Sequence, residues 1–317
     1  MTVSPLKQSK IASTALALLD REIVLPNVIT VGNGGEFKFA LDDTVTIRVP
    51  ARTKAKRRDL RPATENDRTI QLSDLEEQSI QVKLEYNIYN AIGIEDEVAT
   101  LDIADFGTQV LNPQVRAVSV DWENLIAEEI VNAPYTNTVV FDPDKPYHSV
   151  VRANRLLGDA FVPRDGRTLL IGAGVEEALQ TSGQYINASS SGDAVAGNAL
   201  QEATLGFKVA GYNPVVSYAI PENKAYLFHR SAFSAAVVAP IIPKGAVYGK
   251  SINGVNGLAL TWLQDYDALQ SRDRSIVHFY AGTNHTIDPA DENADNAKVA
   301  AGGFLRAVEL TLPGSGS

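Results

Sequence analysis

Apolar and polar residues alternate in three stretches near the start of the chain, the pattern of half-buried β-strands. Apolar side chains take every second position from Phe37 to Leu41, from Val45 to Val49 and from Ile80 to Tyr86. The mostly polar residues 50–79 separate the last two stretches. Connections of this length are uncommon inside a compact domain. The pattern therefore predicts two paired strands that form a long hairpin projecting from the body of the protein.

The connecting segment of this hairpin carries a dense cluster of basic residues, called here the basic tip. Its members are Arg52, Lys54, Lys56, Arg57, Arg58 and Arg61. Basic clusters often bind nucleic acid, but no aromatic residue lies among these for base stacking. One interpretation is a solvated loop. The other is a segment that reaches an acidic surface on a neighbouring copy of the chain.

Helical spacing of apolar residues begins the chain at residues 6–23, where one face is apolar. That face includes Leu6, Ile11, Leu16 and Leu19. The segment is predicted to be either a helix of the main core or an arm that docks onto a neighbouring subunit.

A second helical stretch, residues 101–132, predicts the longest regular element, with a break where Asn112 and Pro113 suit an N-cap and first helical position. The remainder alternates between helix and strand. Helices are expected at 148–159, 175–179 and, in a run of small residues, 231–238. Strands are expected at 168–171, 207–210, 215–219, 224–228, 258–267, 275–281 and 304–312. The pattern favours a mixed α+β body with appendages.

The amino-acid composition excludes several kinds of protein and several kinds of site. The 317 residues carry a net charge of −10, which disfavours a protein that wraps DNA over its whole surface. The chain has no cysteine, so disulfides, thiolate metal sites and cysteine nucleophiles are excluded. No apolar run approaches the ~20 residues of a membrane span, and the N-terminal segment does not have the pattern of a signal peptide. We expect a cytoplasmic protein, or one that stays in whatever it assembles into.

No motif of a known catalytic chemistry is intact. The four histidines lack metal-ligand spacing, and His229 and His278 are expected to be structural. Gly172–Gly174 follows a strand as a phosphate-binding turn would, but Glu177 would repel phosphate there. Asp291–Asp295 begins like a calcium loop that lacks its glycine and its final glutamate. We expect no enzyme activity, no metal and no cofactor.

Four segments resemble, in this order, the tailed-bacteriophage major capsid (coat) proteins of the Hong Kong 97-type fold. Residues 101–116 resemble the entry to that family's spine helix, and 205–214 its strand with a Gly-Phe-x-Val segment. Residues 225–236 are similar to its strand-to-helix step, and 258–280 to the strand pair that returns to its peripheral domain. The resemblance extends over nearly the whole chain.

The resemblance implies an α+β fold in four parts. These are an N-terminal arm (1–35), an extended loop or E-loop with its base strands (36–90), a peripheral domain with the spine helix (91–139 and 256–299) and an axial domain (140–255 and 300–317). It also implies contacts between copies through two sets of residues. These are the basic tip, and the apolar face of the arm formed by Leu6, Ile11, Leu16 and Leu19.

The function that the resemblance implies is self-assembly. Hexamers and pentamers of the chain would tile an icosahedral head shell around double-stranded DNA, assembled in the host cytoplasm and retained in the virion. Packaged DNA would be touched only non-specifically, and no membrane would be involved. Portal, scaffold and decoration proteins are further candidate partners. The alternatives are an encapsulin-type nanocompartment shell, an unrecognised hydrolase and a soluble binding domain.

Overall fold

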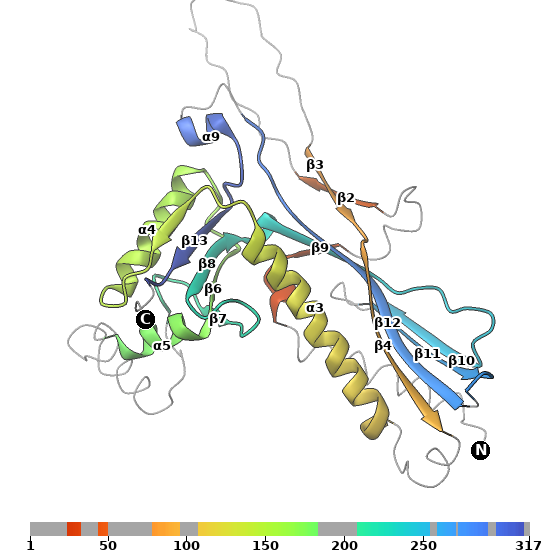
Figure 1. Ribbon diagram of the computed structural model, residues 1–317. Coiled ribbons are helices and arrows are strands. Elements are labelled where there is room, and N and C mark those ends of the chain that lie inside the picture. The colour runs from red at the N-terminus through yellow and green to blue at the C-terminus, as the bar shows by residue number, and fades with distance from the viewer. Residues whose placement is uncertain are drawn as a thin grey trace, which may run out of the picture.

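The computed structural model describes residues 24–32, 44–49, 78–95, 107–182, 208–253, 259–270, 272–290 and 296–313. These residues form an α+β fold with a six-stranded sheet, a five-stranded sheet and a separate two-stranded sheet. Figure 1 shows the two large sheets beside each other, with the long helix α3 (Asn112–Asn132) running along the six-stranded one.

The six-stranded sheet is organised around one long strand, β12. Its strands are β1 (Thr30–Gly32), β4 (Tyr86–Glu95), β9 (Phe233–Val238), β10 (Tyr248–Asn253), β11 (Ala259–Asp267) and β12 (Arg272–His285). Strand β12 pairs antiparallel with β4, β11 and β9, while β1 runs parallel to β9. The predicted hairpin of 258–267 and 275–281 is thereby confirmed. Strands β1, β4 and β10 were not predicted.

Helix α3 forms because its apolar residues recur every three or four positions and cover one face of this sheet. The side chains of Val115, Trp122 and Ile130 are almost fully buried there. The predicted N-cap at Asn112 is wrong, because a π-helical turn, η4 (Gly107–Leu111), leads directly into the first α-helical residue. Pro113 lies in the first turn of α3, where proline is tolerated because its fixed φ suits a helix.

The five-stranded sheet lies between two layers. Its strands are β5 (Thr138–Val140), β6 (Arg167–Ile171), β7 (Pro214–Val216), β8 (Lys224–His229) and β13 (Ala307–Thr311). Helices α4 (Pro146–Asp159) and α5 (Ala173–Thr181) pack against one face through Leu227 and Val308. Tyr226 and Phe228 on the opposite face join the larger core shared with α3. The predicted helices at 148–159 and 175–179 and strands at 168–171, 224–228 and 304–312 are confirmed.

The helix predicted for residues 231–238 is wrong. A short 3-10 turn, η5 (Arg230–Ala232), leads into strand β9, so the expected strand-to-helix step at 225–236 joins two strands instead. Alanines favour a helix locally. Here β9 lies between β1 and β12, and Phe233–Val237 are nearly fully buried, so small side chains fit between covered faces. The expected strand at 207–210 is only a bridge from Val209 to Tyr212 where it is described.

The separate two-stranded sheet confirms the predicted hairpin pairing. Strands β2 (Thr44–Val49) and β3 (Gln78–Lys83) are antiparallel, with Val45 opposite Val82 and Ile47 opposite Ile80. A short helical turn, η1 (Leu25–Asn27), precedes β1, and α9 (Ala297–Ala301) precedes β13. The expected strand at 37–41 lies outside the described residues.

Candidate assembly surfaces

The base of the hairpin is anchored on the six-stranded sheet, on the face away from α3. Phe279 packs edge-on against Trp122 of α3, so the even-numbered residues of β12 face the other way. Asn284 there donates a side-chain hydrogen bond of 2.7 Å to the carbonyl of Gln81. At Gly282 the chain of β3 approaches so closely that an added Cβ would lie 1.9 Å from the Lys83 carbonyl oxygen. Glycine at this position lets the hairpin base rest directly on β12.

Both sets of predicted contact residues lie outside the described residues. This holds for the basic tip, Arg52 to Arg61, and for Leu6, Ile11, Leu16 and Leu19 of the arm. The structure therefore describes where these segments join the body, and their contacts with neighbouring copies stay predictions.

The segment that continues the predicted arm belongs to the body. The carboxylate of Glu123 on α3 accepts hydrogen bonds from the backbone N–H groups of Val24 and Leu25, both at 3.2 Å. Burial raises the pKa of Glu123, and these two hydrogen bonds partly oppose the shift. The side chains of Leu25 and Ile29 are buried in the main core. Residues 24–32 were expected within the arm, so an arm that reaches a neighbour would consist of residues before Val24.

A buried ion pair connects the two large sheets. Arg306, just before β13, binds the carboxylate of Asp288, which follows β12, at 2.6 Å. Arg306 also donates to the hydroxyl of Ser231, in the turn that links β8 of one sheet to β9 of the other. Thr286 donates its hydroxyl to the Ser231 carbonyl at 2.8 Å. All these residues lie at the crossings between the sheets, so the network fixes how the sheets sit relative to each other.

His229 belongs to the same junction. Its Nδ1 lies 2.8 Å from the Ser231 hydroxyl and accepts from the backbone N–H of Ser231 at 3.2 Å. Burial, together with nearby arginines such as Arg306, lowers the pKa of His229, although a hydrogen bond with the backbone of Asp165 opposes this. These contacts give the side chain a structural role, as the sequence predicted.

The glycine-rich turn before α5 has no room for a phosphate. A Cβ on Gly172 would lie 2.3 Å from the carbonyl oxygen of Pro221. The N–H groups of Gly174 and Val175 both donate to the carbonyl of Glu222, at 3.0 and 3.2 Å. The helix N-terminus is thus occupied by the chain itself. Among the described residues no cluster of histidine and acidic side chains could hold a metal ion, and no helix is long and apolar enough to cross a membrane.

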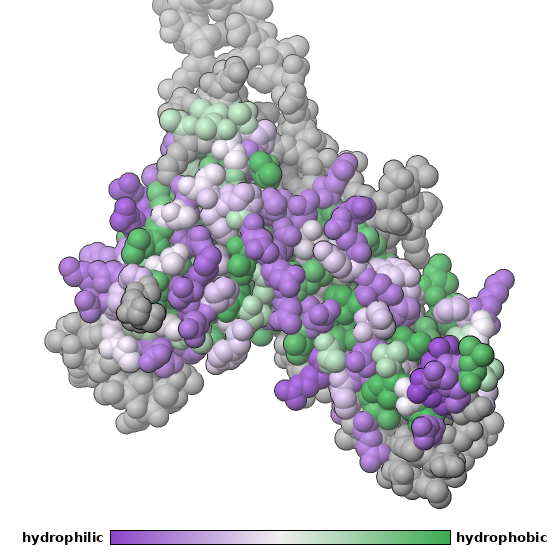
Figure 2. Space-filling model, viewed as in Figure 1, coloured by the Kyte–Doolittle hydropathy of each residue, from purple (hydrophilic) through white to green (hydrophobic). Residues whose placement is uncertain are grey.

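The face of the six-stranded sheet away from α3 carries exposed aromatic side chains. Tyr89 on β4 lies opposite His278 on β12, with Tyr280 two residues further along the same face. Tyr89 is 66% exposed and Tyr280 is 40% exposed. Burial lowers the pKa of His278. Figure 2 shows apolar residues interspersed with polar ones over the face in view, on both halves of the molecule.

Comparison with known proteins gives structural matches only. No family model matches the sequence, and no curated protein matches it. A structure from Mycobacterium phage Che8 is 16% identical, with a TM-score of 0.60, and the match covers 91% of this chain and 90% of that one. The capsid of cyanophage P-SCSP1u is 10% identical, with a TM-score of 0.60, and the match covers 92% and 89%.

A virus-like particle from Pyrococcus furiosus also matches. It is 12% identical, with a TM-score of 0.52, and the match covers 95% of this chain and 98% of that one. Each match extends over almost the whole of both chains. The chain therefore has the α+β fold of phage capsid proteins, the Hong Kong 97-type fold that the sequence resemblance predicted.

Proposed function

We propose that this chain is the major capsid protein of a tailed bacteriophage, and that its copies form the icosahedral shell of the head around double-stranded DNA. The observation that carries the proposal is the extent of the structural match. The match to the mature capsid of bacteriophage PhiM1 covers 92% of this chain and 87% of that one, and the match to the capsid of Ralstonia phage GP4 covers 92% and 88%. The similarity therefore extends over most of each matched capsid chain and is not confined to one part of it.

We further propose four parts for the chain, with boundaries that follow the sheets. The arm would be residues 1–23, because Val24 onward packs in the body. The E-loop would end near Glu85, since β4 belongs to the six-stranded sheet. The peripheral domain would be that sheet with α3, and would include β9 and β10, which the sequence assigned to the axial range 140–255. The axial domain would be the five-stranded sheet with α4 and α5.

In the mechanism of assembly that we propose, the hairpin is fixed at its base on its own subunit and contacts the adjacent subunit with its tip. Its base rests on Gly282, and the Asn284 hydrogen bond prevents it from sliding along β12. The basic tip at the far end would lie across the adjacent subunit and meet carboxylates there. Each exposed ion pair contributes only about 0–1 kcal/mol, so such pairs set orientation while buried apolar area and many repeated contacts hold the shell.

Negative-stain electron microscopy of the expressed protein tests the proposal directly. Closed shells, rings or tubes built from the chain are the expected result. A protein that remains monomeric at high concentration would contradict the capsid function and favour a soluble binding domain.

The role of the basic tip is tested by the double variant Arg57→Glu/Arg58→Glu. We expect loss of shells with the unassembled protein still folded, because reversed charges would repel the acidic neighbour. The matched control is Lys208→Glu/Lys244→Glu, which makes the same change in net charge at two exposed lysines of the body. Normal shells from the tip variant, or equal losses from both variants, would exclude the proposed contact.

A shell that encloses protein cargo is the second candidate, favoured by the match to the Pyrococcus furiosus virus-like particle. The neighbouring genes discriminate between the two functions. Genes for a terminase and a portal protein would indicate a phage head, whereas a gene for a cargo enzyme would indicate an encapsulin-type compartment. In the phage case the protein resides in the virion, with portal, scaffold and decoration proteins as further proposed partners.

A further inference from the structure

Helix α4 ends in a Schellman motif whose left-handed residue is a phenylalanine. The N–H of Phe161 donates to the carbonyl of Gly158, and the N–H of Val162 donates to the carbonyl of Leu157, both at 3.0 Å. These are the two hydrogen bonds that define the motif, and its left-handed position is usually glycine. Phe161 has a φ of 56°, where a Cβ crowds the following carbonyl.

Among the described residues, the side chain of Phe161 is packed into neither hydrophobic core, so core packing does not explain this conformation. The side chain is 60% exposed. The apolar contact that normally accompanies the motif is already made by Val162 and Leu157, which are both buried in the smaller core. Strained backbone at a residue of this kind is typical of functional positions.

Gly158, three residues earlier, is also unfavourable for the stability of the single chain, because it is a glycine at a position where a side chain would fit. It lies in the last turn of α4, it is exposed, and an added Cβ would meet no atom within 4 Å. Alanine would favour the helix there, because glycine loses more conformational freedom on folding. Within four residues the chain thus has a side chain where glycine fits best and a glycine where a side chain fits. Stability of the single chain explains neither choice.

We infer that the C-terminal end of α4 is a contact with a second copy of the chain. Phe161 inserts into the neighbouring copy, and Gly158, which has no side chain, allows the backbone of the neighbouring copy to approach α4 closely. The inference rests on the proposed function and adds a specific surface to it. Large aromatic side chains presented rigidly are the usual anchors of such contacts.

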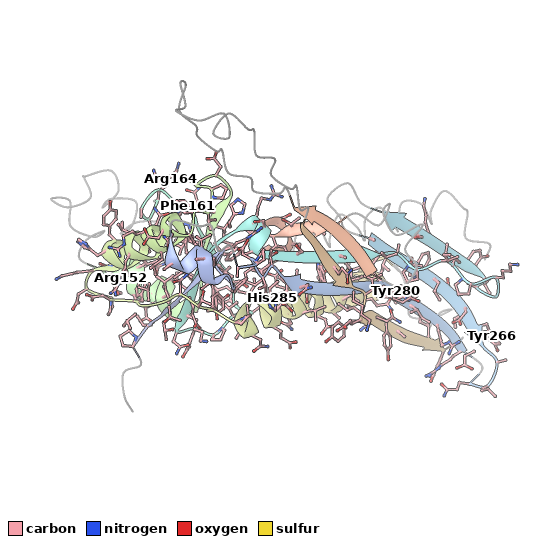
Figure 3. All side chains as sticks on the ribbon, turned by 90° about the horizontal axis from the view of Figure 1, so that it is seen from above. Arg152, Phe161, Arg164, Tyr266, Tyr280 and His285 are labelled. Atoms are coloured by element: carbon pink, nitrogen blue, oxygen red, sulfur yellow. The ribbon has the colours of Figure 1, made fainter. Side chains whose placement is uncertain are left out.

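The charges around Phe161 indicate that the partner at this contact is another copy of the chain. Arg152 and Arg164 are exposed and have no ion-pair partner among the described residues, and Figure 3 shows both in the same lobe as Phe161, far from Tyr266 at the other end of the molecule. The chain has 38 acidic against 28 basic residues, so a second copy has the excess of carboxylates that would complement these two arginines. Nucleic acid is the other kind of partner that exposed arginines attract, and the gel-shift assay below distinguishes it from a second copy.

The test compares stability with assembly in the full-length chain. Phe161→Gly and Gly158→Ala should each raise the Tm of the unassembled protein by about 2 °C, because each relieves an unfavourable local conformation. Phe161→Gly should raise the protein concentration needed for shell formation at least about tenfold, as expected for loss of an interface anchor. Phe161→Tyr keeps the aromatic ring and is the control, with assembly close to that of the natural sequence.

Several results would overturn the inference. An unchanged assembly threshold for Phe161→Gly, with normal shells from the natural sequence, contradicts the contact and leaves the capsid function standing. A lower Tm for Phe161→Gly contradicts the strain argument. If the natural sequence forms no shells, the proposed function fails, and sedimentation velocity decides whether Phe161→Gly weakens self-association. Loss of double-stranded DNA binding in a gel-shift assay, with assembly unchanged, would assign the surface to nucleic acid instead.

Discussion

The two large sheets are covered in different ways. In the five-stranded sheet both faces are buried: Leu227 lies under α4 and α5, while Tyr226 on the other face stacks on Tyr135 in the larger core. In the six-stranded sheet the face under α3 is packed in this manner, whereas the opposite face is covered only in part, at strands such as β9. The opposite face carries the exposed rings of Tyr89 and Tyr280 and supports the hairpin base at Gly282.

The difference shows which sheet faces a single chain buries by itself and which face it leaves exposed for a neighbouring copy to cover. The five-stranded half has a complete core, so its proposed contact is limited to the end of α4. The six-stranded half leaves aromatic surface uncovered, and exposed apolar surface of this kind often marks an interaction site. Three substitutions test how the two halves differ, beginning with the junction that joins the two sheets.

Asp288→Ala should have the largest effect. It leaves Arg306 buried without its counter-ion, since the two side chains are only 7% and 11% exposed, and such losses cost about 3–5 kcal/mol. The free energy of unfolding in urea measures this. The matched control is Asp265→Ala, which removes a more exposed pair with Arg274 near the end of the six-stranded sheet. Equal losses for the two variants would mean that the junction contributes no more than a surface pair.

Gly282→Ala should have an intermediate effect, about 1–3 kcal/mol, because the new Cβ must displace the backbone of Lys83. The hairpin base should loosen, and hydrogen exchange at the amides of β3 should accelerate. Gly245→Ala is the control, since a Cβ there meets no atom within 4 Å. If Gly282→Ala were as stable and as protected as the control, the hairpin base would not rest on β12 in solution.

The pH dependence from His278 should be the smallest effect. Burial lowers the pKa of His278 below its ordinary value of 6.5, so the folded chain binds fewer protons than the unfolded chain just below that pH. Stability should therefore be complete above about pH 6.5 and decrease as the pH falls through this range. Tm measured against pH should show a flatter decrease for His278→Gln. An identical profile would assign the decrease to other groups, such as His229.

Local periodicity predicted the elements whose apolar residues recur at regular spacing in the sequence, such as β2, β3 and α4. It failed at β9, where residues Phe233–Val237 are covered on both faces and show no alternation. It also missed β1, which has only three residues and is defined by pairing with β9. The basic tip and the arm residues were found from composition and spacing, and their contacts remain predictions.

Phe161 was not predicted as a contact residue from the sequence, although the end of α4 contains a signal for it. Helix α4 ends without a glycine or asparagine in the left-handed position, and it contains an exposed glycine one turn earlier. Neither residue is unusual by itself. Only the hydrogen bonds that place Phe161 in the left-handed position show that both choices oppose the stability of the single chain.

Composition and local pattern were enough to predict the order of the elements, the mixed α+β class, the absence of cysteine chemistry and the resemblance to capsid proteins. Tertiary structure alone decided that Glu123 holds Leu25, that Arg306 meets Asp288 and that Gly282 supports the hairpin. These residues are far apart along the chain or lie on different elements. Their contacts follow from how the sheets pack, which no local periodicity records.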